Sequence, residues 1–397
     1  MRIAYICADR GVPVFGCKGA SVHVQKVIRT LVRRGAHVEL FATSIDGEAP
    51  AGLESVCVHA LPPIPKGERA AREQAALAAN SDLYATLERE GPFDLVYERY
   101  SLWSFAGMEY AHAIGVPGLL EVNAPLIEEQ AEYRGLVDRA SAERVAERVF
   151  STATVLIAVS KELAVYLERY PSARGRVHVI PNGVDPNRFS ANLSPSCPSP
   201  PGTFTMGFVG TLKPWHGLPI LVEAFAILHK RDPDTRLLIV GEGPEWASLM
   251  ADLSARGLLE AVHLTGAVVP SEVPGLLVSL DVAVVPYPKR SHFYFSPLKV
   301  YEYMAAGLPV VASQIGQLAD LIQDGINGLL CPPGDPIVLA AALDRLRQKP
   351  ELRVRLGQAA RATVLRDHTW DAIVQRILYY LAGLEPVSQP RHVEVRS

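Results

Sequence analysis

Short apolar runs alternate with amphipathic stretches along most of this chain. The first run, residues 2–8, is followed by a loop punctuated by Gly and Pro. Residues 20–34 then repeat apolar positions with helical spacing and stop at Gly35. Because the same alternation continues through the N-terminal half, the pattern predicts an α/β protein whose strands form parallel sheets.

The N-terminal half carries six predicted strands and four predicted helices. The strands are expected at residues 2–8, 37–42, 94–97, 118–122, 155–159 and 177–180. The helices are expected at residues 20–34, 69–90, 102–114 and 126–150.

Residues 191–202 interrupt the pattern with four prolines and three serines, which cannot continue a strand or helix. We interpret them as a linker between domains at 1–190 and 203–369. The strand and helix alternation then restarts. Strands are expected at residues 203–209, 236–240, 262–265, 282–286 and 309–312, and helices at 217–230, 244–256, 297–306, 336–348, 351–365 and 370–381.

Composition narrows the class of protein. A chain of 397 residues with 49% hydrophobic and 20% charged residues fits a two-domain globular protein. A net charge of −3 without a Lys/Arg-rich block argues against nucleic acid as a partner. The short apolar start does not resemble a signal peptide, and no transmembrane stretch appears, so we expect a cytoplasmic protein. The five scattered cysteines form no Cys-x-x-Cys pair, which argues against a zinc site.

Two glycine-containing loops lie between a predicted strand and the next helix. Gly16 and Gly19 let the backbone approach a ligand at a helix N-terminus, where phosphate is favoured. Their spacing does not match the dinucleotide fingerprint Gly-x-Gly-x-x-Gly, and a tight turn without a ligand stays open. In the second half, Glu242 between Gly241 and Gly243 either caps a helix or faces a ligand.

The most informative segment is residues 293–313, which predicts a helix after an N-cap at Ser296 and a strand after Gly307. Glu302 lies within the apolar part of this helix, so its carboxylate needs a partner. A ribose diol offers two hydroxyl donors, and an internal salt bridge is the alternative. Lys299 lies near the helix start, where a cation is better explained if a phosphate joins the site.

This segment resembles the signature of family 4 glycosyltransferases, a retaining group with the GT-B fold. The resemblance covers roughly residues 1–380. Five further segments carry it: the Gly-rich loop before Ala20-Ser21-Val22-His23-Val24, Ala158-Val159-Ser160, Ile180-Pro181-Asn182-Gly183-Val184-Asp185, Gly210-Thr211-Leu212-Lys213-Pro214-Trp215-His216-Gly217 and Val240-Gly241-Glu242-Gly243-Pro244. It implies two Rossmann-like domains facing each other across a cleft, with the final helix, about 370–383, packed on the first domain.

The resemblance also assigns donor-site roles. Glu302 matches the second glutamate of the family's Glu-x7-Glu motif, which holds the donor ribose. The loop from Phe295 to Lys299, with Ser296 and Leu298, matches the segment whose backbone amides meet the donor sugar and diphosphate. Thr265 lies in the stretch that matches the nucleobase seat.

Other positions of this chain match the motifs of the family or differ from them. Gly16 and Gly19 match the N-terminal loop that approaches the phosphates. The first glutamate of the motif falls at Tyr294. The family's phosphate-binding Arg and Lys fall at Thr211 and His216. The donor site is therefore predicted to include Gly16, Gly19, Thr211, His216, Glu242, Thr265, Tyr294, Phe295, Ser296, Leu298 and Glu302.

Catalysis is assigned to Lys299, Lys213 and Asn123. The two lysines are expected to stabilise the leaving diphosphate. Asn123 occupies the place of a histidine that is frequent in the family, which we interpret as a variant site. No Asp-x-Asp lies at a strand end, so neither a metal nor another cofactor is expected.

Acceptor contacts are predicted at the carboxyl ends of the N-terminal strands, where open α/β sheets bind ligands. These candidates are Glu98, Arg99, Glu121 and Glu128, and a surface ion-pair network is the alternative. His23 on the first predicted helix is a further acceptor candidate, with an ordinary polar helix position as the alternative. Arginines between residues 134 and 148 are interleaved with acidic residues, which favours a solvated, salt-bridged face over a membrane-binding surface. At most a peripheral membrane contact is expected.

The predicted reaction is transfer of a sugar from a nucleoside diphosphate sugar to an acceptor hydroxyl, with retention of anomeric configuration. The acceptor is a saccharide, a lipid-linked saccharide or a small molecule. Two alternatives stay open: a nucleotide-sugar epimerase on the same fold, and a non-catalytic nucleotide-sugar-binding protein.

Overall fold

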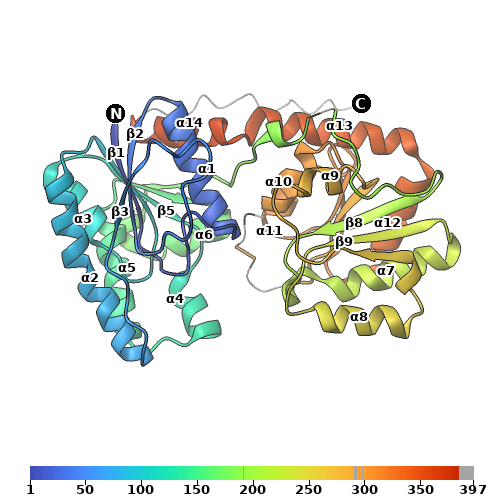
Figure 1. Cartoon of the computed structure of the whole chain (residues 1–397), viewed down its shortest axis with the longest axis horizontal. Helices are drawn as coiled ribbons and strands as arrows, with labels where there is room; N and C mark the ends of the chain where they lie inside the picture. The colour runs from blue at the N-terminus through green and yellow to red at the C-terminus, as the bar shows by residue number, and fades with distance from the viewer. Residues whose placement is uncertain (191, 290–292, 295, 297, 384–397) are drawn as a thin grey trace. The chain divides into compact units, whose positions relative to one another are not determined.

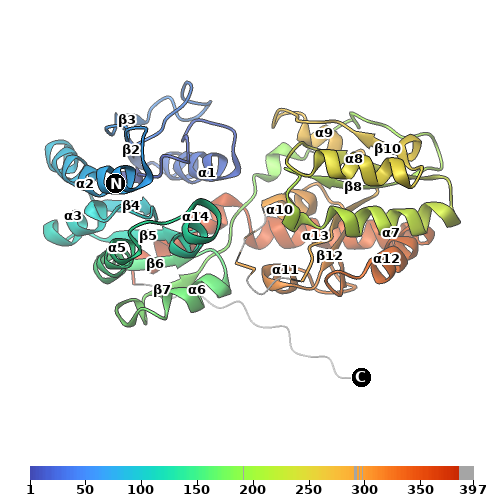
Figure 2. The same cartoon turned by 90° about the horizontal axis from the view of Figure 1, so that it is seen from below.

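A computed structural model describes residues 1–190, 192–289, 293–294, 296 and 298–383. The described chain divides into two compact units, each a parallel sheet flanked by helices (Figures 1 and 2). Among the described residues, the first unit combines 1–159, 163–180 and 371–383, and the second combines 160–162 and 181–370.

The N-terminal unit is built on seven parallel strands in the order β3-β2-β1-β4-β5-β6-β7. The strands are β1 (Arg2–Cys7), β2 (His37–Ala42), β3 (Cys57–Ala60), β4 (Leu95–Arg99), β5 (Gly118–Val122), β6 (Val155–Ala158) and β7 (Val177–Val179). The helices are α1 (Gly19–Arg33), α2 (Arg69–Glu90), α3 (Ala106–Ile114), α4 (Leu126–Glu129), α5 (Arg139–Thr152) and α6 (Lys161–Leu167). Their apolar positions are buried on the sheet because central parallel strands are covered on both faces.

The last helix, α14 (Trp370–Leu381), packs against this unit. The Arg33 guanidinium donates a hydrogen bond to the Asp371 carboxylate at 2.8 Å. The ring of Tyr380 stacks on that of His178 with centroids 3.8 Å apart.

The C-terminal unit is built on six parallel strands in the order β10-β9-β8-β11-β12-β13. The strands are β8 (Phe204–Val209), β9 (Thr235–Val240), β10 (Val262–Leu264), β11 (Val282–Val285), β12 (Val310–Ser313) and β13 (Leu329–Cys331). The helices are α7 (Leu218–Arg231), α8 (Trp246–Ala255), α9 (Val273–Leu277), α10 (Leu298–Ala305), α11 (Gly316–Leu321), α12 (Pro336–Gln348) and α13 (Pro350–Asp367). Apolar residues of the strands and helices form two clusters of the core.

The segment predicted as a linker packs against the C-terminal unit. The backbone N–H of Ser196 donates to the Gly275 carbonyl at 2.9 Å, and that of Cys197 donates to the Ser279 hydroxyl at 3.0 Å. The compact units meet in sequence at Ile180 and Pro181, about ten residues earlier than the linker interpretation placed the boundary.

The long helix predicted at residues 126–150 is wrong, because the chain breaks it into α4, a π-helical turn (Gln130–Arg134) and α5. Gly135 has φ of 75°, a conformation that ends the turn and that glycine adopts without strain. Asp138 then starts α5 as its N-cap, since its carboxylate accepts a hydrogen bond from the Ser141 backbone N–H at 2.9 Å.

Candidate active site

Lys299 on α10 is held in an aromatic and imidazole environment in the C-terminal unit. Its Nζ lies 3.3 Å from Nε2 of His216 and 4.2 Å from the ring centroid of Phe208. Burial lowers the pKa of Lys299 to about 7, although the nearby Glu302 carboxylate opposes the shift. A cation in such a place is poorly solvated, so an incoming phosphate would stabilise it.

His216 orients this lysine. Its Nδ1 lies 2.7 Å from the carbonyl oxygen of Thr211, and its ring stacks on Tyr287 at 5.3 Å. Burial, followed by the positive charge of Lys299, lowers the pKa of His216 to about 3. The ring is therefore neutral. Since Nδ1–H donates to the carbonyl, Nε2 is left to accept from the Lys299 ammonium group.

Gly210 leaves room for the lysine. It ends the strand β8 with φ of 141°, and a Cβ built there would lie 2.8 Å from Nζ of Lys299. The backbone conformation therefore favours glycine, and any other residue would also displace the Lys299 ammonium group from its position.

Glu302, on the same helix, forms an ion pair with Arg188 from a 3₁₀ turn (Pro186–Arg188). Arg188 also donates from Nη2 to the carbonyl oxygen of Pro270 at 2.6 Å. The two paired side chains are 25% and 24% exposed, so the pair remains accessible to a ligand. The internal salt bridge that the sequence left open is therefore present, and the ribose role of Glu302 stays a prediction.

The loop before α10 is tied to the Pro-Asn-Gly segment. Ser296 accepts a hydrogen bond from the backbone N–H of Asn182 at 3.0 Å with its hydroxyl. The Asn182 side-chain amide donates to the Ser296 carbonyl at 2.9 Å. Tyr294 and Leu298 are half-buried beside it, whereas the predicted contact at Phe295 lies outside the described residues.

Further donor candidates gather at the carboxyl ends of β8, β9 and β10. Gly241 donates its N–H to the Gly266 carbonyl at 3.0 Å, and the Thr265 hydroxyl donates to the same carbonyl at 2.9 Å. The Glu242 carbonyl accepts from the Leu212 N–H at 3.0 Å. Thr211 is exposed in the same loop, and the charge of Lys213 contributes to lowering the pKa of His216, which places it nearby.

A second group of predicted residues converges in the N-terminal unit on the buried carboxylate of Glu121. Nε2 of His23 lies 2.5 Å from it, the Asn123 amide donates to it at 2.7 Å, and the Tyr97 hydroxyl also donates to it. Nη1 of Arg99 lies 3.8 Å away. Burial alone would raise the pKa of Glu121, but the charge and hydrogen bond of His23, with Arg99, lower it to about 2. This anion lies at the carboxyl edge of the sheet.

Glu98 and Glu128 do not join that group. Glu98 is fully buried, accepts a hydrogen bond from the Ser104 hydroxyl at 2.5 Å, and has its pKa raised to about 7 by burial. Glu128 lies 3.5 Å from the Arg139 guanidinium as a partly exposed ion pair. Their environments favour structural roles over the predicted acceptor contacts.

The predicted glycine loop is folded on itself. The N–H of Gly16 donates to the Pro13 carbonyl at 2.9 Å, and the Gln25 side chain donates to the Gly16 carbonyl at 2.8 Å. Gly19 is the first residue of α1. Both glycines therefore lie at the start of the helix, in a turn, and their phosphate role stays a prediction.

Sequence reasoning missed a cavity of about 510 Å³ in the N-terminal unit. Four arginines line it: Arg10, Arg69, Arg72 and Arg134. Nε of Arg72 is buried and has no hydrogen-bond partner within the described structure. In the sequence, only the arginines between residues 10 and 134 could have indicated this site. They come from three separate segments, and no motif connects those segments.

No helix in the described part of the chain is long and apolar enough to cross a membrane. On the arginine-rich face of α5, Arg139 pairs with Glu143 at 2.7 Å and Arg148 pairs with Glu109 at 2.7 Å. These ion pairs favour the salt-bridged interpretation of that face over a membrane contact.

Comparison with known proteins identifies the family. Residues 18–188 match the family described as Glycosyltransferase Family 4, and residues 203–349 match Glycosyl transferases group 1. A D-inositol 3-phosphate glycosyltransferase from Arthrobacter sp. (strain FB24) is 30% identical over 367 residues, covering 86% of this chain and 85% of that protein. This chain belongs to glycosyltransferase family 4.

Solved structures agree on the fold of this glycosyltransferase. HepE from Anabaena, solved with UDP, has a TM-score of 0.73 at 21% identity and covers 97% of this chain and all of that one. Sucrose-phosphate synthase from Thermosynechococcus elongatus has a TM-score of 0.73 at 21% identity over 96% and 98% of the two chains. The two Rossmann-like units therefore have the GT-B architecture.

Proposed function

We propose that this glycosyltransferase moves a hexose from a nucleoside diphosphate sugar to a hydroxyl of a phosphate-bearing small molecule, without a metal ion and with retention of configuration. The observation that carries the proposal is Lys299 at the start of α10. Its ammonium group is poorly solvated and is positioned by the neutral ring of His216.

The donor diphosphate is proposed to bind at Lys299, with Lys213 and the amides of the Ser296 loop beside it. Breaking the bond between sugar and diphosphate places negative charge on the leaving phosphate, and a preorganised cation stabilises that charge. The Lys299 ammonium group supplies it without a divalent ion. Glu302 is proposed to accept hydrogen bonds from the donor ribose. Uridine nucleotides are the first candidates, because the HepE structure holds UDP.

The acceptor is proposed to bind in the arginine-lined cavity of the N-terminal unit. The relative from Arthrobacter is named for an inositol phosphate acceptor. Guanidinium side chains such as those of Arg72 and Arg134 bind phosphate and carboxylate groups through paired hydrogen bonds, and the name of this relative favours phosphate. The Glu121 cluster, with His23 and Asn123, lies at the carboxyl edge of the same sheet and is proposed to contact acceptor hydroxyls.

A transfer assay tests this proposal. The protein is incubated with UDP-, GDP-, ADP- and TDP-hexoses and with polyol or sugar phosphates, and products are detected by mass spectrometry. The proposal expects one glycosylated phosphate ester whose anomeric configuration, read by proton NMR, equals that of the donor. An inverted product would overturn retention.

Two further outcomes bear on the same assay. Activity that is lost in EDTA and restored by Mg²⁺ or Mn²⁺ would overturn metal independence. Release of nucleoside diphosphate without any glycosylated product would point to hydrolysis or epimerisation of the donor instead of transfer.

A further inference from the structure

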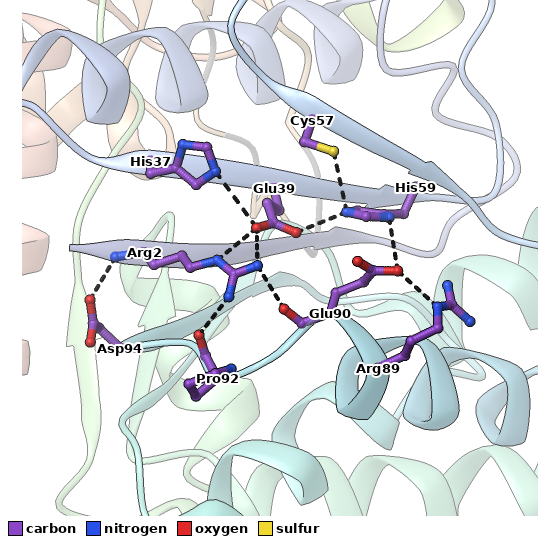
Figure 3. A network of polar contacts seen from close by, with 9 residues as sticks. All are labelled: Arg2, His37, Glu39, Cys57, His59, Arg89, Glu90, Pro92 and Asp94. Atoms are coloured by element: carbon purple, nitrogen blue, oxygen red, sulfur yellow. Dashed lines mark hydrogen bonds and ion pairs between the residues drawn. The ribbon is translucent and has the colours of Figure 1, made fainter.

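Four potential metal ligands lie on one face of two neighbouring strands (Figure 3). His37 and Glu39 alternate along β2, and Cys57 and His59 alternate along β3. Side chains two residues apart on a strand share a face. The parallel register pairs Glu39 with Cys57, so the two alternating pairs lie beside each other.

Three of these side chains bring different ligand atoms together. Sγ of Cys57 lies 3.6 Å from Nε2 of His59, and that nitrogen lies 2.9 Å from Oε2 of Glu39. All three ligand atoms lie within 4.8 Å of one another. A tetrahedral zinc ion with usual bond lengths separates sulfur from nitrogen by about 3.5 Å and nitrogen from oxygen by about 3.3 Å. The observed separations are within a few tenths of an ångström of these values.

His37 lies beside this group of three and would reach the metal position by a rotation of its side chain. Its Nε2 lies 3.7 Å from the other carboxylate oxygen, Oε1 of Glu39, and its side chain is 61% exposed. An exposed imidazole rotates at little cost, and water is the alternative fourth ligand. The buried Glu39 and the half-buried His59 are held more firmly, with side chains 4% and 15% exposed.

Arg2 supports this arrangement. Its guanidinium contacts Oε1 of Glu39 at 2.6 Å, which leaves Oε2 toward His59 and Cys57. The same guanidinium donates to the carbonyl oxygens of Glu90 and Pro92 at 2.6 and 3.1 Å, so it is anchored independently of Glu39. Arg2 therefore fixes the orientation of the carboxylate, as partners of metal ligands commonly do.

We propose that Cys57, His59 and Glu39 bind a divalent transition-metal ion of the zinc type, with His37 as the fourth ligand. Thiolate and imidazole ligands in a tetrahedral set select such ions over Mg²⁺ or Ca²⁺. The ion joins the edge strand β3 to β2. Because β3 leads directly to Leu61 and Ile64, which line the arginine-rich cavity, the ion steadies one wall of that cavity. The site does not depend on the donor chemistry proposed above.

Cobalt spectroscopy of the full chain tests the site. Co²⁺ is titrated into reduced, metal-free protein, and absorption is followed for thiolate charge transfer and for the intense d–d bands of tetrahedral Co²⁺. The wild type is expected to develop both bands with one equivalent of Co²⁺, and Zn²⁺ is expected to displace them. Cys57→Ser should abolish the charge-transfer band, and Cys17→Ser, which alters another exposed cysteine, should leave it unchanged.

A thermal unfolding series completes the test. Zn²⁺ is expected to raise the Tm of the wild type and of the control His263→Ala, which alters an exposed histidine on β10 in the C-terminal unit. It is expected to leave the Tm of Cys57→Ser and His59→Ala unchanged. The metal-free Tm of each variant shows whether it folds. Absence of the cobalt bands in the wild type, or equal bands in Cys57→Ser, would overturn the proposal. An equal zinc-dependent rise in Tm for Cys57→Ser would do the same.

Discussion

Nζ of Lys299 lies 3.3 Å from Nε2 of His216, although 83 residues separate the two in sequence. The imidazole is held neutral and its Nδ1 is occupied by the Thr211 carbonyl, so it accepts from the ammonium group and fixes its direction. The resemblance places a cationic residue of the family at the position of His216. We therefore expect Lys299 to supply the positive charge here and the neutral imidazole to position it.

The Lys299 charge predicts how donor affinity depends on pH. Because burial places the pKa of the free lysine at about 7, the ammonium group loses its proton as pH rises through that value. Affinity for a nucleoside diphosphate should fall by up to about tenfold per pH unit above 7. Calorimetric titrations between pH 6 and 9 measure the slope. Lys299→Arg, whose guanidinium stays charged, should remove most of it, and an equal slope in that variant would contradict the role.

The Arg188–Glu302 ion pair predicts a coupled loss of nucleotide binding. Arg188 pairs with Oε1 of Glu302, and the donor ribose is proposed to contact the same carboxylate. Glu302→Gln should weaken binding by about 1–3 kcal/mol, and Arg188→Met by less. In the double variant the two losses should not add. The readout is the affinity for the nucleoside diphosphate and for its deoxyribose analogue.

The ribose assignment has its own control in that experiment. The wild type should discriminate between ribose and deoxyribose, and both variants should lose the discrimination. Arg256→Met removes an exposed arginine that is paired with Asp252, and it should change nothing. Discrimination that survives in Glu302→Gln would remove Glu302 from the ribose.

The arginine-lined cavity predicts a selective effect on the acceptor. Arg72→Met should raise KM for a phosphate-bearing acceptor by about 10- to 100-fold, because a charge-assisted hydrogen bond is lost, and should leave donor affinity unchanged. Steady-state kinetics with each substrate varied in turn separate the two effects. Arg139→Met, which alters an exposed ion-paired arginine, is the matched control. Equal acceptor KM values in both variants would place the acceptor elsewhere.

Glu98 predicts a pH dependence of stability. Burial raises its pKa from 4.5 to about 7, so between these values the folded chain binds the proton more tightly than the unfolded chain. Stability should therefore fall as pH rises from 4.5 to 7, by up to about 3 kcal/mol in total. Urea unfolding at pH 5 and pH 8 measures this change. Glu98→Gln should show a smaller change, and the same pH dependence in both proteins would refute the assignment.

The regular helices and strands were predictable because the spacing of their apolar residues, and the Gly and Pro residues at their ends, agree with how they pack. Residues 69–90 and 336–348 form α2 and α12 with the expected bounds, and residues 118–122 form β5. The strand β3 was missed because Cys57–Ala60 is a short, partly exposed edge strand whose apolar run is interrupted by His59. The proposed zinc-type cluster was missed because its ligands alternate along two strands, one of them β3, and no Cys-x-x-Cys pair marks it.

The candidate site was predictable where a motif carried it, as at Lys299 and Glu302. Contacts between distant segments were not. The pairing of Glu302 with Arg188 depends on how a turn after the Pro-Asn-Gly segment meets α10, and the burial of Glu98 depends on Gly107 and Ser104 covering it. Such relationships follow from packing, which residue types alone do not encode.

The central claim is that α10 binds a nucleoside diphosphate, and calorimetric titration of the wild type with UDP, GDP, ADP and TDP tests it most directly. One of the four should bind stoichiometrically without added metal, and Lys299→Met with Glu302→Gln should reduce that affinity at least tenfold while the fold is kept. If none of the four binds, or if the double variant binds as tightly as the wild type, the account of this site is contradicted.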